Sequence, residues 1–131
     1  MFGKKKQPPI KSLIAQGSHI EGHLRFTDGL RVDGSIKGDI RANDEQPSIL
    51  VISESAMVYG EIHADHVIIN GAVVGPVYAS ELLELQPKAR IEGDVHYKAL
   101  EMHQGATITG QLRPMLDGEE KPMLKLAANN G

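Results

Sequence analysis

The 131-residue chain contains no cysteine and no tryptophan, and only three tyrosines and two phenylalanines. Without cysteine the chain has no disulfide framework and no thiol chemistry, which is compatible with a reducing compartment. Few large aromatic side chains are available to fill the interior of a conventional β-sandwich. The sequence instead places Ile, Val, Leu, Ala and Gly in repeating positions, which suits a narrow core made of similar layers.

The chain also lacks a long hydrophobic run and a large excess of charge. No apolar stretch approaches the roughly 20 residues that a membrane-spanning helix needs, and the N-terminal residues lack the apolar segment of a secretory signal. Because the formal net charge is only -3, electrostatics gives no reason to expect nucleic acid as a primary partner. A length of 131 residues and a hydrophobic content of 40% favour one packed domain.

One short phrase recurs along the chain. Residues 89–95 carry small or apolar side chains at every second position, and residues 106–112 repeat this pattern. A period of two places alternate side chains on opposite faces of a strand. The chain contains six copies, whose central glycines are Gly22, Gly38, Gly60, Gly75, Gly93 and Gly110. The longest spacing, between the second and third glycines, contains the polar run 41–48, and the conformation of that corner stays unassigned.

The repeat predicts a β-solenoid. About 17 residues are too few for a strand plus a full helix, and residues 13–113 show no helical periodicity. Short strands joined by tight corners fill each repeat, so we predict an all-β, single-domain parallel β-helix of about six coils. Its interior would contain three apolar columns. The first holds Ile20, Ile36, Val58, Val73, Ile91 and Ile108, the second holds Leu24, Ile40, Ile62, Val77, Val95 and Leu112, and the third holds Leu30/Val32, Leu50/Ile52, Val67/Ile69, Leu83/Leu85 and Leu100/Met102.

The chain divides into three predicted segments. Residues 1–12 form a disordered basic leader, in which Pro8 and Pro9 disfavour both helix and central strand. Residues 13–113 form the β-helix domain, which we expect to be the polymerisation domain. Residues 114–131 begin with Pro114 and are mostly polar, so we expect a disordered C-terminal tail.

Both ends of a β-solenoid expose a coil whose backbone groups have no further coil to pair with. The first coil offers Ile20, Leu24 and Phe26, and the last coil offers Ile108 and Leu112. Soluble solenoids usually cover such ends with polar capping repeats, and no regular cap is evident beyond either coil. We therefore predict end-to-end polymerisation through these five residues. The alternative is that the flanking segments fold over the ends.

Three phrases together resemble a bactofilin, a bacterial cytoskeletal protein. They are MFGKKK at 1–6, GSHIEG at 17–22 and VDGSIKGDI at 32–40. The resemblance covers the whole chain and implies a right-handed β-helix that polymerises into nonpolar filaments without nucleotide or another cofactor, with disordered ends. It also implies a scaffold that localises cell-wall, polarity or morphogenesis proteins and so influences cell shape. Many family members bind the inner face of the cytoplasmic membrane.

The resemblance assigns membrane targeting to Met1, Phe2, Lys4, Lys5 and Lys6. Met1 and Phe2 can bury in the acyl boundary, and each lysine is attracted to anionic headgroups by about 1 kcal/mol. A filament repeats this weak anchor many times, so avidity strengthens attachment. The expected partners are other copies of the chain, anionic inner-membrane lipid and cell-wall synthesis or polarity proteins, at a cytoplasmic position peripheral to the membrane. The alternative interpretation is a solubilising basic tail.

Outward positions of the predicted coils form ladders of polar side chains. Asp39, Glu61 and Asp94 occupy equivalent positions, and a neighbouring column contains Arg25, Arg41, His63, Tyr78, His96 and Arg113. A solvated, charge-balanced surface is the simpler interpretation of these ladders. The other hypothesis is a lateral contact or partner-docking face, because solenoids present their outward ladders as extended binding surfaces.

The alternative function is a small, trimeric left-handed β-helix enzyme of the acyltransferase or carbonic anhydrase type. Those enzymes require an aliphatic residue at every sixth position, whereas this chain alternates over seven residues in coils of uneven length. His63 and His66 can form a pair, but no third metal ligand has a convincing spacing. The sequence therefore favours a non-enzymatic protein without a catalytic, cofactor or metal site.

Overall fold

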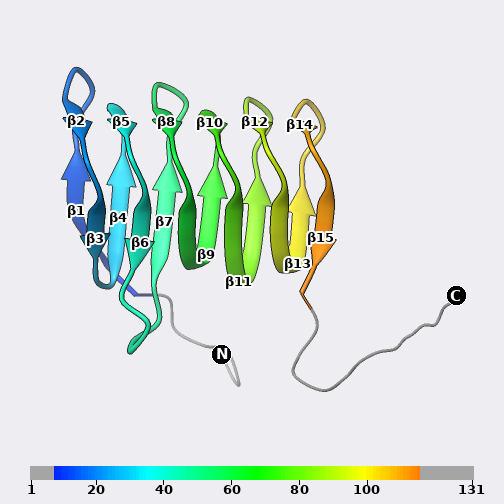
Figure 1. The fold of residues 1–131 in the computed structure, drawn as a ribbon, viewed down its shortest axis with the longest axis horizontal. Coiled ribbons are helices and arrows are strands. Elements are labelled where there is room, and N and C mark those ends of the chain that lie inside the picture. The colour runs from blue at the N-terminus through cyan, green and yellow to red at the C-terminus, as the bar shows by residue number, and fades with distance from the viewer. Residues whose placement is uncertain (1–7, 116–131) are drawn as a thin grey trace, which may run out of the picture.

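A computed structural model describes residues 8–115, whose regular elements are β-strands wound into a row of stacked coils (Figure 1). Every coil contributes to two parallel sheets, one of nine strands and the other of six. The chain makes about six turns between its first and last strands. The predicted all-β parallel solenoid is confirmed.

The smaller sheet contains one short strand from each coil. Its strands are β2 (His19–Glu21), β5 (Ser35–Lys37), β8 (Met57–Tyr59), β10 (Ala72–Val74), β12 (Arg90–Glu92) and β14 (Thr107–Thr109). All neighbours pair in parallel with no shift in register. The coils are therefore stacked one directly above another along this wall.

The larger sheet covers the other two walls of each coil. Its strands are β1 (Ile10–Ile14), β3 (Leu24–Phe26), β4 (Gly29–Val32), β6 (Ile40–Ala42), β7 (Ile49–Ile52), β9 (Ile62–Ile69), β11 (Val77–Leu85), β13 (Val95–Met102) and β15 (Leu112–Pro114). In β9, β11 and β13, one long strand passes through the corner between the two walls. In the first two coils the corner separates two shorter strands, and at one of these corners Asp28 has a φ of 63°.

The strand register confirms the three predicted apolar columns. In the first column, for example, Ile36 pairs with Ile20 on one side and Val58 on the other. The interior members of all three columns are buried in one continuous core. Alternation along each strand accounts for this packing, because every second side chain points inward from the pleated backbone.

A column of glycines runs along one corner of the solenoid. All six glycines that mark the repeats have positive φ angles, among them Gly60 with a φ of 151°. A Cβ atom at Gly60 would overlap the carbonyl group of Gly38 in the neighbouring coil, and the same relation recurs along the column. Glycine is needed here because both the backbone conformation and the close approach between coils exclude a side chain.

The N-terminal boundary of the solenoid lies earlier than predicted. Strand β1 begins at Ile10, within the segment 1–12 that the sequence favoured as a disordered leader, and pairs in parallel with β4. Ser12 and Ile14 face Leu30 and Val32, so β1 supplies the third wall of the first coil. The prolines precede this edge strand and do not interrupt it, which is where proline is tolerated in a sheet.

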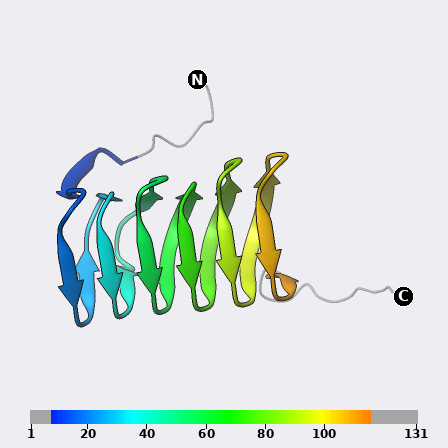
Figure 2. The same ribbon diagram turned by 90° about the horizontal axis from the view of Figure 1, so that it is seen from above.

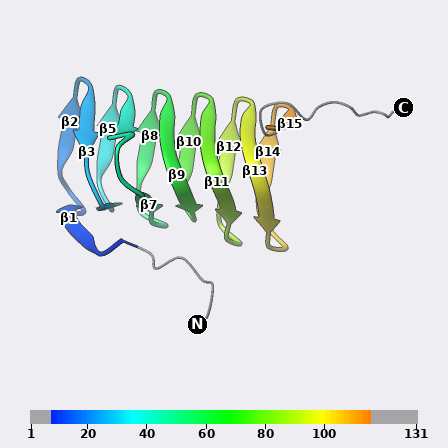
Figure 3. The same cartoon turned by 90° about the horizontal axis from the view of Figure 1, so that it is seen from below.

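Figure 2 and Figure 3 show the coils from above and below, with β1 at one end of the row and β15 at the other. The final strand includes Pro114, the first residue of the predicted tail. Residues 1–7 and 116–131 lie outside the described residues.

The polar insert forms the loop between β6 and β7, which projects from the row of coils (Figure 1). The loop is tied to the next coil by a reciprocal pair of hydrogen bonds. The Ser48 backbone N–H donates to Asp65 Oδ2 at 3.1 Å, and the Asp65 backbone N–H donates to Ser48 Oγ at 3.0 Å. Ser48 is consequently buried, whereas residues 43–47 of the loop are exposed.

Candidate assembly and docking surfaces

The residues predicted to mediate assembly lie in the two terminal coils. Ile20 and Leu24 belong to β2 and β3 at one end, whereas Ile108 and Leu112 belong to β14 and β15 at the other. The first three are partly buried against the adjacent coil, and Leu112 is 50% exposed. Each terminal coil therefore leaves open one side of apolar columns that are closed everywhere in the interior.

Phe26, the fifth predicted assembly residue, is the least accessible of the set. Its side chain is only 9% exposed and belongs to the buried core. In the register of β3 and β6 it faces Ala42, whose small side chain leaves room beside it. Phe26 therefore contributes mainly to the packing of the first coil within the chain.

The structure adds apolar residues to the terminal surfaces that the sequence analysis did not assign to assembly. Ile10 and Leu13 are exposed on β1, and Met102 is 45% exposed at the end of β13. Met102 could have been selected from the sequence because it ends the third apolar column. Strand β1 gave a weaker signal because it lacks the central glycine of the repeat and follows two prolines.

The terminal strands also present unpaired backbone edges. Within residues 8–115, β2 and β14 are the edges of the smaller sheet, and the larger sheet has free edges at β1 and β3 at one end and at β15 at the other. Between interior coils, hydrogen bonds run in both directions along the stack: the Gly60 N–H donates to the Val74 carbonyl at 2.9 Å, and the Ser53 N–H donates to the Val32 carbonyl at 3.0 Å. Each end thus offers donors and acceptors, so backbone chemistry alone imposes no polarity on a junction.

The outward column predicted from strand parity is continuous in the structure. Its members pair in register from coil to coil: Arg25, Arg41, His63, Tyr78, His96 and Arg113. The ring centroids of His63 and Tyr78 lie 4.3 Å apart with an interplanar angle of 11°. Tyr78 and His96 are also 4.3 Å apart, at 14°. Three stacked rings therefore follow the axis of the solenoid on its outer surface.

Carboxylates beside this column connect neighbouring coils. Asp94 Oδ1 accepts the Gln111 backbone N–H at 2.9 Å, and Asp94 Oδ2 accepts the Arg113 Nε–H at 3.0 Å. The backbone hydrogen bond from Gln111, followed by the one from Arg113, holds the pKa of Asp94 below its ordinary value. Asp39 Oδ1 accepts the backbone N–H of Glu61 in the same way at 3.0 Å.

The column has different charge environments at its two ends. His63 Nε2 lies 2.9 Å from Glu61 Oε1, and Arg113 is paired with Asp94. Among residues 8–115, Arg25 and Arg41 form no ion pair, although they face each other in neighbouring strands. The N-terminal part of the column is therefore the more cationic part.

The residues predicted to bind the membrane, Met1, Phe2, Lys4, Lys5 and Lys6, lie outside the described part of the chain. Within residues 8–115, no helix has the length and apolar character needed to cross a bilayer. His63 and His66, weighed above as a metal-binding pair, have different surroundings. His63 stacks on Tyr78, whereas burial lowers the pKa of His66 and is partly opposed by Glu84 and Glu101.

Comparison with known proteins agrees with this architecture. Residues 12–113 match the family model described as bactofilin, polymer-forming cytoskeletal. The chain is 27% identical over 111 residues to bactofilin BacO of Myxococcus xanthus, which covers 85% of each protein. It is 27% identical over 93 residues to bactofilin BacP of the same organism, covering 71% of this chain and 37% of that relative. No solved structure gives a significant match.

The family match decides between the two functions considered from the sequence. It spans nearly all of the solenoid, including both terminal coils and the outward column. The matched family is cytoskeletal and non-enzymatic, and it is neither the acyltransferase nor the carbonic anhydrase type. The chain belongs to the bactofilin family of polymer-forming cytoskeletal proteins.

Proposed function

We propose that the protein assembles without nucleotide into nonpolar filaments, in which first coils join first coils and last coils join last coils. The observation that carries this proposal is the exposure of Leu112 at the end of a column whose interior members are buried. Joining two terminal coils covers these apolar side chains and pairs free backbone edges. The like-to-like arrangement follows the family resemblance, and the donors and acceptors at each end are compatible with it.

The expected contribution of each side chain to a junction is modest. Complete burial of a leucine contributes about 1.5–3 kcal/mol, so covering the exposed half of Leu112 would contribute about half of that value. Both partners supply such residues, and several apolar positions and backbone pairs act together. The junction therefore depends on the whole face of the coil, and one charged side chain placed within that face should disrupt it.

The filaments are further proposed to attach to anionic membrane through Met1, Phe2 and the lysines at positions 4–6. The support is chemical, because apolar and basic side chains stand next to each other in the first six residues. Filament formation multiplies this contact. The outward column from Arg25 to Arg113 is the proposed docking face for cell-wall or polarity proteins, because it stays accessible along the side of the solenoid.

Charged substitutions at the two terminal coils test the filament model. Leu112→Arg should block the last-coil junction and leave dimers that are joined through first coils. Leu24→Arg should block the first-coil junction and leave dimers that are joined through last coils. Nucleotide-free samples are examined by negative-stain microscopy and analytical ultracentrifugation. Head-to-tail assembly would give a different result: each variant alone would be monomeric, and dimers would form only when the two variants are mixed.

Tyr59→Arg is the matched control for these substitutions. Tyr59 is also an exposed apolar residue, but it lies on the outer face of an interior strand. This variant should form filaments of ordinary length. Circular dichroism and thermal melting show whether Leu24→Arg, which changes a partly buried site, keeps the fold. Filaments of normal length from both folded terminal variants would contradict end-to-end assembly.

Membrane attachment is tested with the full chain and vesicles that contain anionic lipid. Phe2→Glu removes an apolar contact and adds repulsion from the headgroups, so the filaments should no longer sediment with the vesicles. Tyr59→Glu introduces the same charge on the solenoid and should leave sedimentation unchanged. Binding of the Phe2 variant at the wild-type level would exclude membrane targeting by this segment without affecting the filament model.

A further inference from the structure

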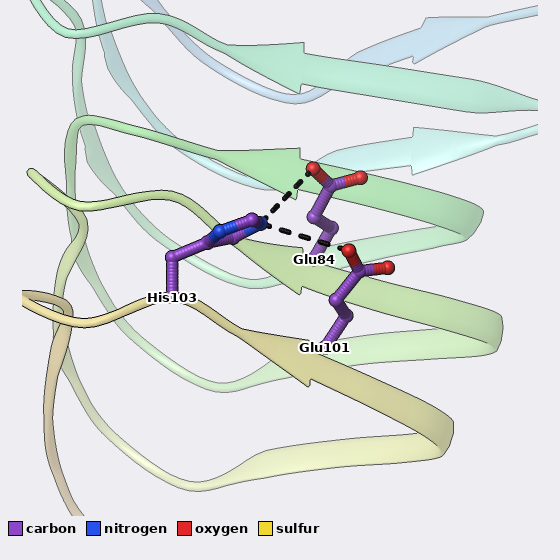
Figure 4. Close-up of side chains that lie close together, drawn as sticks. All are labelled: Glu84, Glu101 and His103. Atoms are coloured by element: carbon purple, nitrogen blue, oxygen red, sulfur yellow. Dashed lines mark ion pairs between the residues drawn. The ribbon is translucent and has the colours of Figure 1, made fainter.

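Three side chains that the assembly model does not use converge near the C-terminal end of the solenoid. Glu84 lies on β11, Glu101 lies beside it on β13, and His103 follows the end of β13. One ligand atom from each residue lies within 4.8 Å of the others. Figure 4 shows the imidazole directed toward both carboxylates. The arrangement brings together two oxygen ligands and one nitrogen ligand from two neighbouring coils.

The distances within this cluster suit a shared cation better than direct hydrogen bonds. His103 Nε2 lies 3.6 Å from a carboxylate oxygen of Glu84 and 3.6 Å from one of Glu101. These separations are too long for good hydrogen bonds. Ligands about 2.1 Å from a tetrahedral zinc ion are about 3.4 Å apart along each edge. The two His103–carboxylate separations are therefore close to the edge length of such a site, and all three ligand atoms lie within 4.8 Å of one another.

Electrostatics also favours a cation at this position. Glu84 and Glu101 face each other directly in adjacent parallel strands, an arrangement in which like charges destabilise a sheet. A divalent ion between the carboxylates would replace their repulsion by attraction.

Gln86 supports the orientation of the cluster. Its Nε2 donates a hydrogen bond at 3.3 Å to Glu84 Oε2, the same oxygen that lies 3.6 Å from His103 Nε2. Metal-binding carboxylates commonly receive such an outer hydrogen bond, which fixes the direction of their lone pairs. The side chain of Glu84 is also the least exposed of the three ligands, at 21%. The inner coil therefore offers a comparatively fixed ligand, to which the last coil adds Glu101 and His103.

We propose that Glu84, Glu101 and His103 bind a divalent transition-metal cation of the zinc type, which links the last coil to the coil before it. Oxygen and imidazole ligands together suit Zn²⁺ and its first-row neighbours better than Mg²⁺, which prefers oxygen ligands in an octahedron. The fourth position would be open to water or to a ligand from an adjoining copy. This site does not depend on the proposed filament polarity or on membrane attachment.

A metal at this position would act on the part of the solenoid that has a neighbour on only one side. Ligand binding to the folded state alone raises its stability in proportion to the logarithm of ligand concentration. The ion would hold β13 against β11 beside the open end of the stack. We expect it to raise the melting temperature and to reduce hydrogen exchange in the last coil more than in interior coils.

Equilibrium dialysis of the full chain against Zn²⁺ tests the proposal, with bound metal quantified per chain. The wild-type protein should bind one zinc ion per chain at saturation, and excess Mg²⁺ should not displace it. The double variant Glu101→Gln/His103→Ala should lose this binding, with affinity reduced by at least about tenfold. Zn²⁺ should raise the melting temperature of the wild type and not that of the variant.

The opposite end of the solenoid supplies a matched control. His19 and Glu21 form an exposed pair, with 3.3 Å between His19 Nε2 and Glu21 Oε2, and they belong to no three-ligand cluster among residues 8–115. The variant Glu21→Gln/His19→Ala should bind zinc like the wild type. Glu84→Gln provides a second test from the inner coil, and melting in chelator establishes that each variant is folded.

Three results would overturn the proposal. The first is the absence of saturable zinc binding by the wild type. The second is unchanged binding in folded Glu101→Gln/His103→Ala and Glu84→Gln variants. The third is a melting temperature that does not respond to Zn²⁺, as expected if the cluster holds only a proton. None of these results bears on polymerisation, because filaments can be scored independently in the presence of chelator.

Discussion

Val95 and Leu112 occupy the same position in successive coils, yet Val95 is fully buried and Leu112 is 50% exposed. The two residues differ in their surroundings because, within residues 8–115, Val95 has a coil on each side and Leu112 has one only. The same relation holds in the first column between buried Ile91 and partly exposed Ile108. Interior and terminal coils thus carry the same kinds of apolar side chain at the same positions. Addition of another copy would continue the packing that already stabilises the solenoid.

The two terminal coils are nevertheless different from each other. The first is partly closed, because Phe26 is buried and β1 completes the third wall. The last exposes Met102 and Leu112, whereas the first exposes Ile10 and Leu13 on β1. In a filament that joins like ends, two kinds of junction would alternate, and each would cover exposed apolar side chains.

The glycine column gives the strongest expected contrast between an interior and a terminal coil. Gly60→Ala places a Cβ against the Gly38 carbonyl at a φ of 151°, so we expect a loss of more than about 3 kcal/mol in the free energy of unfolding. A Cβ at Gly22 has no atom within 4 Å, so Gly22→Ala should lower the free energy of unfolding by only about 1–2 kcal/mol, through the positive φ alone. Chemical denaturation measures both, and equal losses would contradict the account of coil spacing.

The second apolar column gives the next largest contrast. Ile62→Ala removes a fully buried side chain from an interior coil and should reduce the free energy of unfolding by about 2–5 kcal/mol. Leu112→Ala in the last coil should change it by less than about 1 kcal/mol, because half of that side chain is already exposed. If both variants are folded, Leu112→Ala should shorten the filaments more than Ile62→Ala does. A large loss of stability at Leu112 would show that the last coil is not open.

The stacked rings on the outer surface should contribute less. Tyr78→Ala removes both ring contacts, each with a centroid distance of 4.3 Å, and should lower the free energy of unfolding by about 1–2 kcal/mol. Tyr59→Ala removes an exposed ring that takes part in neither stack and should have a smaller effect in thermal melting. Equal effects would mean that the stack contributes no specific stability and would leave docking as its only role.

The smallest expected effect concerns Asp94, which links the last two coils through Gln111 and Arg113. Its pKa is lower in the folded protein than the ordinary value of 3.8, so its contribution is present above that value. The contribution disappears as pH falls through the lower folded pKa. Protection of the Gln111 amide from hydrogen exchange, measured relative to its intrinsic rate at each pH, should therefore fall in strong acid, and Asp94→Asn should remove this loss of protection. Identical pH profiles for the variant and the wild type would contradict this role.

The repeat could be predicted from sequence because each coil is specified locally. A glycine followed by alternating apolar residues fixes the corner, the strand and its inward face within a few positions. Strand β1 cannot be predicted in this way because it lacks that glycine and follows two prolines. The prolines next to it correctly indicated a break, but the break falls before the strand.

The cluster of Glu84, Glu101 and His103 required knowledge of the strand register. Glu84 and Glu101 are 17 positions apart (101 − 84 = 17) and meet only because β11 pairs with β13 in parallel. Glu84 lies between two leucines of the third column, as Glu101 lies between Leu100 and Met102. Aligning the coils would have placed both carboxylates outward and adjacent. The approach of His103 depends on the corner that follows β13, which the repeat pattern did not describe.

The hydrogen bonds that join neighbouring coils run along the length of the rod. A force that stretches the rod must therefore load all the bonds between two coils together, whereas a force on a free strand end can break them one after another. This geometry favours a fibre that is stiff under tension and vulnerable to peeling at its tips. Loss of subunits from such a fibre would then begin at its tips.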